Sequence, residues 1–139
     1  MRLLARREHS RAELRGKLLP HVQDGEDVEQ VLDELEKRNW LSDARATEQV
    51  VHAKRGRFGA QRIAHELRRK GIAEDLIVKA LPQLKETELD AAREVWRTKF
   101  GVLPSDRNQQ AKQVRFMQSR GFSPDVIFEI LRRGPAREE

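Results

Sequence analysis

The hydrophobic positions of this chain recur at helical spacing along most of its 139 residues. Apolar residues three or four positions apart predict an amphipathic helix, whereas apolar residues at every second position predict a strand. The second pattern is found nowhere in the sequence. Leu, Ala, Arg, Glu and Gln dominate the composition, and these residue types favour helices. We therefore predict an all-α protein.

Capping residues, glycine and proline mark the ends of the expected helices. The first begins after Ser10, which forms a capping-box pattern with Glu13, and it closes at Pro20. The others are expected from Asp27 through Leu35, from Ser42 to about Arg55, from Ala60 to Lys70, from Ile72 to Leu84, from Thr87 to Phe100, from Ser105 to Arg120, and from Ser123 through Leu131.

The apolar pattern repeats along the chain. At an offset of 49 residues, the stripe in 28–35 aligns with that in 77–84, and at an offset of 50, Gly71-Ile72 aligns with Gly121-Phe122. The second offset fails where Ile63 aligns with Gln113. Units of this size bury little core alone, so stacking should supply much of the stability. We predict helical units at 1–43, 44–84 and 85–134, followed by a tail at 135–139.

The two tryptophans, Trp40 and Trp96, lie at joins between expected helices, and we expect both to pack between units. The longest apolar runs have two or three residues, and the basic N-terminus lacks the apolar stretch of a signal peptide. We therefore expect a cytoplasmic protein with no membrane partner. We also expect a monomer, although the sequence does not fix the oligomeric state.

No catalytic motif can be found. The absence of cysteine excludes a thiolate zinc site, a disulfide and a Cys nucleophile. His65-Glu66 begins like a zincin helix motif, but Arg69 stands where the second histidine belongs. Gly56 and Gly59 are not followed by the Lys-Ser or Lys-Thr of a phosphate loop. We expect no catalytic residues, no metal and no cofactor, and we interpret the chain as a binding protein rather than an enzyme.

Charge alternates in blocks beneath a net charge of +5. Residues 1–20, 21–43, 44–71, 72–92 and 93–139 carry +4, −6, +6, −3 and +4. A basic face raises phosphate affinity, whereas an acidic face repels DNA and suits a basic protein partner. Each block could equally be a solvated helix face. The acidic stretch Asp24–Glu36 is thus either a partner surface or a solubilising one.

The basic candidates for binding DNA or a protein–DNA complex form two groups, and arginine, which suits bidentate phosphate contact, predominates in both. The first group is Arg6, Arg7, Arg11 and Arg15, and the second is Lys54, Arg55, Arg57, Arg62, Arg68 and Arg69. Phe58 lies within the second group and either stacks on a base or packs down on its own unit. Arg68 and Arg69 would also complement a helix C-terminus without any ligand.

Residues 59–81 could also be interpreted as a helix-turn-helix that reads bases in the major groove. The second helix of that motif would begin with Glu74 and Asp75, and its only basic residue is Lys79. An acidic N-terminal end is unsuited to base edges, so we do not expect sequence-specific recognition.

Several segments, taken in order, resemble the RecX family of bacterial RecA regulators. They are Ala5–Leu14, Val31–Leu35 with Asn39–Ala46, Lys54-Arg55-Gly56 with Gly59 and Ile63, Glu66–Ile72, and Arg115–Met117 with Arg120–Ser123 and Ile130-Leu131. The sequence departs from the family where Asn39-Trp40 replaces the usual glycine and aromatic pair. It also starts close to the first motif, so we expect either a shortened first helix or a missing N-terminal segment.

The resemblance implies three tandem three-helix repeats in an elongated, curved array. It further implies binding along the groove of the RecA–single-stranded DNA filament, with inhibition of filament extension, ATP hydrolysis and strand exchange. The alternative is a general single-stranded nucleic-acid-binding protein that competes for DNA. The sequence leaves open which repeat meets RecA and which meets DNA, and whether the protein caps filament ends or disassembles filaments.

Overall fold

The computed structural model describes residues 7–23 and 27–134, which contain helices and loops and no strand. This confirms the all-α prediction. The helices are α2 (Arg11–Leu18), α3 (Val28–Lys37), α4 (Asp43–Lys54), α5 (Ala60–Arg69), α6 (Glu74–Lys99), α7 (Arg107–Ser119) and α8 (Pro124–Arg133), with a 3₁₀ turn, η1 (Leu19–His21), after α2.

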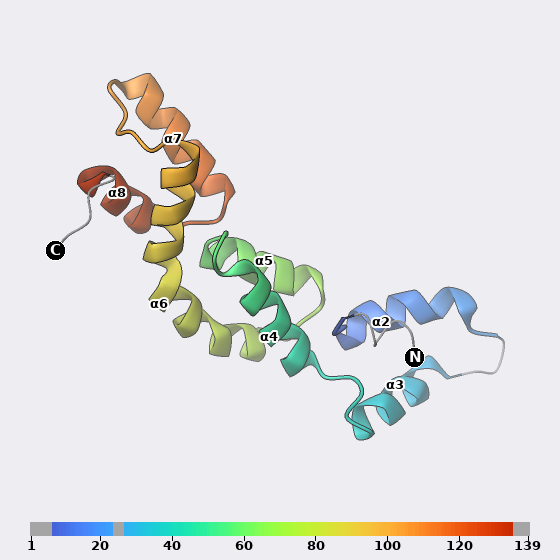
Figure 1. The fold of residues 1–139 in the computed structure, drawn as a ribbon. Coiled ribbons are helices and arrows are strands. Elements are labelled where there is room, and N and C mark those ends of the chain that lie inside the picture. Colours follow the sequence, from blue (N-terminus) through green and yellow to red (C-terminus); the bar gives the residue numbers. More distant parts are fainter. Residues whose placement is uncertain (1–6, 24–26, 135–139) are drawn as a thin grey trace.

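The helices form three groups in a row, which give the molecule an elongated, bent shape (Figure 1). Each group has its own core of buried side chains. Module 1 contains α2 and α3 around Leu14 and Leu32. Module 2 contains α4, α5 and the first part of α6 around Ile63. Module 3 contains the rest of α6 with α7 and α8, around Trp96 and Phe122.

Most of the expected caps are present. Ser10 and Glu13 form the capping box of α2, and the side chains of Ser42 and Ser123 cap α4 and α8. The prediction for α7 was wrong by one residue, because its N-cap is Asp106, whose carboxylate accepts from the backbone N–H of Gln109. A carboxylate caps a helix as well as a hydroxyl does.

The prediction of separate helices at 72–84 and 87–100 was wrong, because α6 runs unbroken through both. Its buried positions continue at helical spacing from Leu84 to Glu88 and Ala91, and they pass from the core of module 2 to that of module 3. Thr87 caps nothing, and its hydroxyl donates to the Leu84 carbonyl at 3.5 Å. Pro82 lies inside this helix, which is bent along its length (Figure 1).

The prediction that both tryptophans pack between units was also wrong. Trp96 is fully buried inside the core of module 3, whereas Trp40 is 51% exposed and has the Arg38 guanidinium over its ring. Trp40 follows Asn39, which has a φ of 64°. Asparagine tolerates this left-handed conformation better than most residues, so it can form the turn before Trp40.

Gln113, where the repeat pattern fails, is buried between two polar groups. The Trp96 Nε1 atom donates to its Oε1 at 2.8 Å, and its Nε2 donates to the Val102 carbonyl at 3.0 Å. The side chain thus satisfies a buried indole N–H that an apolar residue would leave without a partner. The exception to the apolar pattern is explained by the tryptophan beside it.

Candidate nucleic-acid interface

The first basic group predicted from sequence is held in ion pairs within module 1. Arg6 lies outside the described residues. The Arg7 guanidinium lies 3.1 Å from Glu13, and Arg15 lies 2.6 Å from Glu29. Arg11 contacts three carboxylates on α3, those of Glu29, Asp33 and Glu36. These arginines neutralise much of the acidic face of α3, so part of the acidic stretch has an internal role.

Hydrogen bonds from Arg15 and Arg11 hold the Glu29 carboxylate in its charged form and lower its pKa to about 2. The hydrogen bond between Arg15 and Glu29 also raises the pKa of Arg15. For either arginine to bind a phosphate, it would first have to leave this carboxylate.

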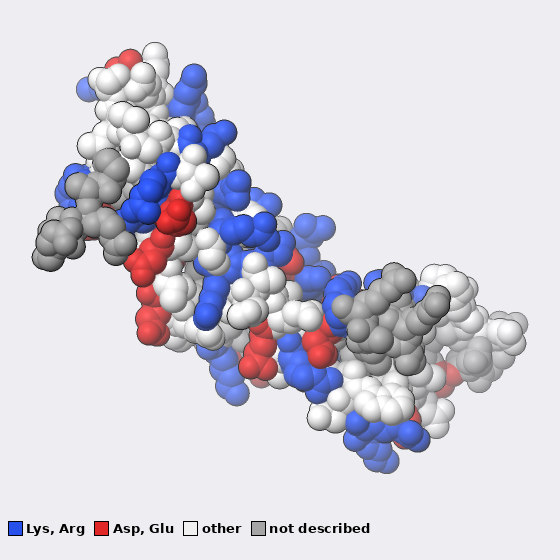
Figure 2. Space-filling model, viewed as in Figure 1, with Lys and Arg blue, Asp and Glu red and all other residues white. Residues whose placement is uncertain are grey.

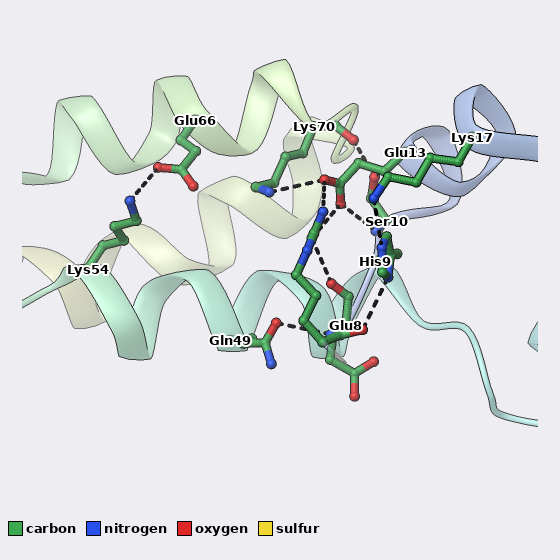
Figure 3. Close-up of polar contacts among 10 residues, drawn as sticks. Glu8, His9, Ser10, Glu13, Lys17, Gln49, Lys54, Glu66 and Lys70 are labelled. Atoms are coloured by element: carbon green, nitrogen blue, oxygen red, sulfur yellow. Dashed lines mark hydrogen bonds and ion pairs between the residues drawn. The ribbon is translucent and has the colours of Figure 1, made fainter. Parts of the chain in front are cut away.

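Polar contacts join module 1 to module 2 (Figure 3). The Lys70 ammonium lies 3.1 Å from the Glu13 carboxylate, and the Ser10 hydroxyl donates to the Lys70 carbonyl. On the other side of the junction, the Glu8 backbone N–H donates to the Gln49 side chain at 3.1 Å. Lys70, the last cation before the turn at Gly71, is therefore a structural residue.

His9 lies buried beside this junction. Its Nδ1 donates to the Arg7 carbonyl at 3.1 Å, which leaves Nε2 to accept from the Lys17 ammonium at 3.3 Å. Burial, together with the positive charges of Arg7 and Lys17, lowers the pKa of His9. The imidazole is thus neutral and holds the start of α2 in place.

Module 2 donates hydrogen bonds to two backbone carbonyls of module 3, at the C-terminal end of α7. The Gly59 N–H donates to the Arg120 carbonyl at 2.8 Å, and the Arg62 guanidinium donates to the Ser119 carbonyl at 2.9 Å. Gly121, with a φ of +88°, lies so close to Arg62 that a Cβ on the glycine would overlap it. Gly71 lies against Ala12 in the same way, and these two residues stand 50 positions before Gly121 and Arg62, respectively. The repeat in the sequence is therefore also a repeat of the junctions.

A half-buried aromatic ring surrounded by cations marks the second junction. Phe58 packs against the core of module 2, which confirms the interpretation that it packs on its own unit. Four cationic groups lie within 5.7 Å of its ring centre, with the Arg62 guanidinium closest at 4.4 Å. We call these residues the Phe58 cluster: Lys54, Arg57, Phe58, Arg62 and Arg120.

The basic surface continues onto module 3. Arg120 also lies over the Phe116 ring, at 5.2 Å from its centre, and Lys99 lies over the same ring at the same distance. Figure 2 shows lysine and arginine side chains gathered over α5 and α7, while acidic side chains follow one edge of α6. Sequence reasoning missed Arg120 and Lys99. For Arg120, the 50-residue offset could have indicated a cation at the second junction, because it aligns Arg120 with Lys70.

The remaining cations of the second predicted group lie elsewhere. Arg55 lines a groove of about 430 Å³ between α4 and α6, together with His52 and Lys79. Arg68 is paired with Glu74 at 2.8 Å, and Arg69 lines a polar hollow of about 360 Å³ that Arg62 and Lys70 also line. Of the six candidates, the structure therefore brings Lys54, Arg57 and Arg62 together around Phe58 and places Arg69 beside Arg62. It separates Arg55 and Arg68 from them.

The Phe58 cluster has the chemistry of an anion-binding surface. Arg57 and Arg62 are exposed beside an aromatic ring, an arrangement that suits phosphates and stacked bases. Among the described residues, no group of histidines and carboxylates is arranged to hold a metal ion. In the same part of the chain, no helix has the length and apolar character needed to cross a membrane.

Three family models match the sequence, and together they extend over most of it. They describe the first, second and third three-helix domains of RecX and match residues 1–35, 42–81 and 86–131.

Curated relatives are similar over nearly the whole chain. The regulatory protein RecX of Leptothrix cholodnii is 50% identical over 132 residues, which are 95% of this chain and 84% of that protein. The regulatory protein RecX of Ralstonia pickettii is 44% identical over 92% of this chain and 80% of its own length.

Solved structures share the fold. The crystal structure of RecX from Lactobacillus salivarius superposes with a TM-score of 0.77 at 21% identity, over 95% of this chain and 89% of that one. A second crystal structure, of a regulatory protein RecX, gives a TM-score of 0.78 at 23% identity, over 94% of this chain and 68% of that one.

Proposed function

This chain belongs to the RecX family, and from that premise we propose that it binds the RecA–single-stranded DNA filament and inhibits RecA. The inhibited steps are ATP hydrolysis, filament extension and strand exchange. The protein acts by occupancy, which shifts the filament equilibrium and requires no chemistry of its own. Its place of action is the cytoplasm.

The Phe58 cluster is the observation that carries this proposal. Its cations converge where modules 2 and 3 meet, near the middle of an elongated molecule (Figures 1 and 2). A filament groove offers phosphates over a long path, and a row of modules can follow such a path while placing its cations against DNA. The arginines of module 1 would contribute only after leaving their carboxylates.

The alternative, competition for naked single-stranded DNA, rests on the same basic surface. The two functions differ in what they require of RecA. A competitor binds DNA tightly by itself, and its inhibition follows the salt dependence of that binding. A filament regulator inhibits at concentrations at which its affinity for naked DNA is weak.

Titration into a RecA–single-stranded DNA ATPase assay, with RecA in large excess, tests the proposal. Loss of hydrolysis at far less than one copy per RecA would indicate capping of filament ends or propagated disassembly. Loss only near equimolar amounts, with weak naked-DNA binding, would indicate occupancy of the groove. Unchanged hydrolysis at every ratio would refute the RecA function.

A matched pair of variants tests the Phe58 cluster within the same assay. The change Arg57→Ala with Arg120→Ala removes two cations from the cluster, and we expect about tenfold weaker inhibition. The change Arg55→Ala with Lys79→Ala removes two cations from the groove between α4 and α6 and should leave inhibition within about twofold of wild type. An equal loss in both variants would mean that only net charge matters.

A further inference from the structure

The outer end of module 3 carries exposed apolar side chains. Val102 is 70% exposed and Phe128 is 49% exposed, and Leu103 lies beside them in the loop after α6. These are three of the seven large hydrophobic residues that are exposed in the described part of the chain. Their grouping at one end distinguishes them from the single apolar residues that any protein surface carries.

Leu103 separates two shallow hollows at this end. One, of about 250 Å³, is lined by Phe100 and Val102 together with Lys112. The other, of about 340 Å³, is lined by Pro104 and Phe128 together with Leu131 and Arg132. We call the apolar residues of this region the end surface: Val102, Leu103, Pro104, Phe128 and Leu131.

An apolar end is unusual in a row of repeats. Each repeat buries its apolar side against its neighbours, so the last repeat needs a polar outer face to remain soluble. A contiguous exposed apolar surface with hollows is typical of a protein interface. The end surface therefore indicates a partner beyond module 3.

The charges around the end surface define the chemistry of that partner. Lys112 lines one of the two hollows, is exposed, and forms no ion pair with another described residue. Arg132, on the opposite rim, is paired with Glu129. A DNA backbone would meet these cations but would leave Val102 and Phe128 in water. A protein that presents apolar side chains beside carboxylates matches both features.

We infer that the end surface docks a protein whose own surface combines apolar side chains with carboxylates. The inference rests on the proposed function, under which the docked partner is a RecA protomer of the filament. Module 3 then holds the protein component of the filament by its outer end, while the Phe58 cluster holds the DNA. This division assigns the two partners to two different parts of one array.

Two double variants that each remove two exposed large hydrophobic side chains test the inference. Val102→Ser with Phe128→Ser alters the end surface. Leu19→Ser with Val78→Ser, at positions that are each 55% exposed, is the control. Circular dichroism should show that both fold, because all four side chains are about half exposed or more. We expect the first variant to inhibit the RecA–DNA ATPase about tenfold less strongly and the control to match wild type within about twofold.

Two binding measurements separate protein docking from DNA binding. Fluorescence anisotropy with a labelled single strand should give the same DNA affinity for wild type and for the end-surface variant. Capture of DNA-free RecA on an immobilised wild-type chain should be lost with that variant and retained with the control. Lys112→Glu should weaken the capture, whereas Lys85→Glu, a charge reversal at an exposed position in the middle of α6, should not.

Several results would overturn the inference. Equal inhibition by wild type and the end-surface variant would refute docking while leaving the proposed function intact. Parallel loss of DNA affinity would assign the end surface to DNA. A wild-type dimer that the end-surface variant converts to monomers, measured by sedimentation, would make a second copy the occupant. A wild-type chain that does not inhibit RecA would refute the proposed function, and the inference with it.

Discussion

Gln113 is a residue whose identity is set by one neighbour. The apolar pattern of α7 calls for a hydrophobic side chain there, as at Ile63 in α5. The amide instead bridges the Trp96 indole and the Val102 carbonyl in an otherwise apolar core. A tryptophan can be fully buried only when its N–H finds an acceptor, so the two residues belong together.

We expect Gln113→Leu to destabilise the protein by about 1–3 kcal/mol, because it leaves the buried Trp96 N–H without a partner and removes the donor to the Val102 carbonyl. Urea unfolding followed by tryptophan fluorescence measures this change. Gln118→Leu, at an exposed position on the same helix, is the control and should stay within about 0.5 kcal/mol of wild type. Equal stability of the two variants would show that the bridge contributes nothing.

Glu13 makes the junction between modules 1 and 2 sensitive to acid. Burial by itself would raise the pKa of this carboxyl, but hydrogen bonds from the Ser10 backbone, Arg7 and Lys70 outweigh it and lower the pKa to about 2. A carboxyl with a lowered folded-state pKa stabilises the fold above its ordinary pKa of 4.5. That contribution is lost as the pH falls from about 4.5 towards 2.

Glu13→Gln should therefore flatten the loss of stability between about pH 5 and pH 3, and the wild-type chain should lose about 2 kcal/mol more than the variant over this range. Urea midpoints at a series of pH values give the comparison. Other carboxylates, Glu29 among them, titrate in both proteins and cancel in the difference. Identical pH profiles would contradict the assignment.

At the residue scale, the sequence located cations but could not show which of them were already paired. Arg11 and Arg57 carry the same charge, and both are binding candidates from the sequence. Nevertheless, Arg11 faces three carboxylates of α3, whereas Arg57 lies beside an aromatic ring. The difference arises from contacts between helices, which the spacing within one helix does not contain. The three members of the Phe58 cluster that were predicted, Lys54, Arg57 and Arg62, lie within one short stretch of sequence.

At the scale of the elements, glycine decides where helices can meet. Gly121 has a positive φ at the end of α7 and lies against Arg62 of α5, while the neighbouring Gly59 lies against the Gly121 carbonyl. These glycines let the two modules approach at the level of their backbones. Gly16 lies inside α2 with no atom near the place where its Cβ would be.

Alanine at these glycines should have opposite effects. Gly121→Ala should cost about 2–4 kcal/mol, because it combines an unfavourable φ with overlap at Arg62. Gly16→Ala should stabilise the protein by up to about 1 kcal/mol, because alanine forms helices better than glycine does. Thermal unfolding of the two variants measures both changes in stability. A Gly121→Ala protein as stable as wild type would show that the modules do not need this close contact.

Helix ends were predictable from sequence where a polar side chain caps them, as Ser42 and Ser123 do. The failure at α6 has a physical cause. Proline and threonine near residue 85 are typical of a break between helices, and nothing local shows that the apolar stripe passes from one core to the next. The packing of α6 against the cores of modules 2 and 3 compensates for the backbone hydrogen bond that Pro82, which has no N–H, cannot donate.

At the scale of the whole molecule, the basic surface should determine how binding depends on salt. Each phosphate contact on a single strand contributes about 0.7 to the slope of log affinity against log salt concentration. Removing Arg57 and Arg120 together should lower that slope by about 1.4. Anisotropy titrations at several salt concentrations measure it, and a slope equal to that of wild type would mean that neither residue contacts phosphate.

The uninterrupted course of α6 has a consequence for how the protein unfolds. A row of three repeats would ordinarily have three units that can open separately. Because one helix contributes Leu84 to the second core and Trp96 to the third, neither module can lose it without disturbing the other. Native-state hydrogen exchange should therefore find two cooperative units. Residues 42–134 should open together, and module 1 should open at a lower free energy.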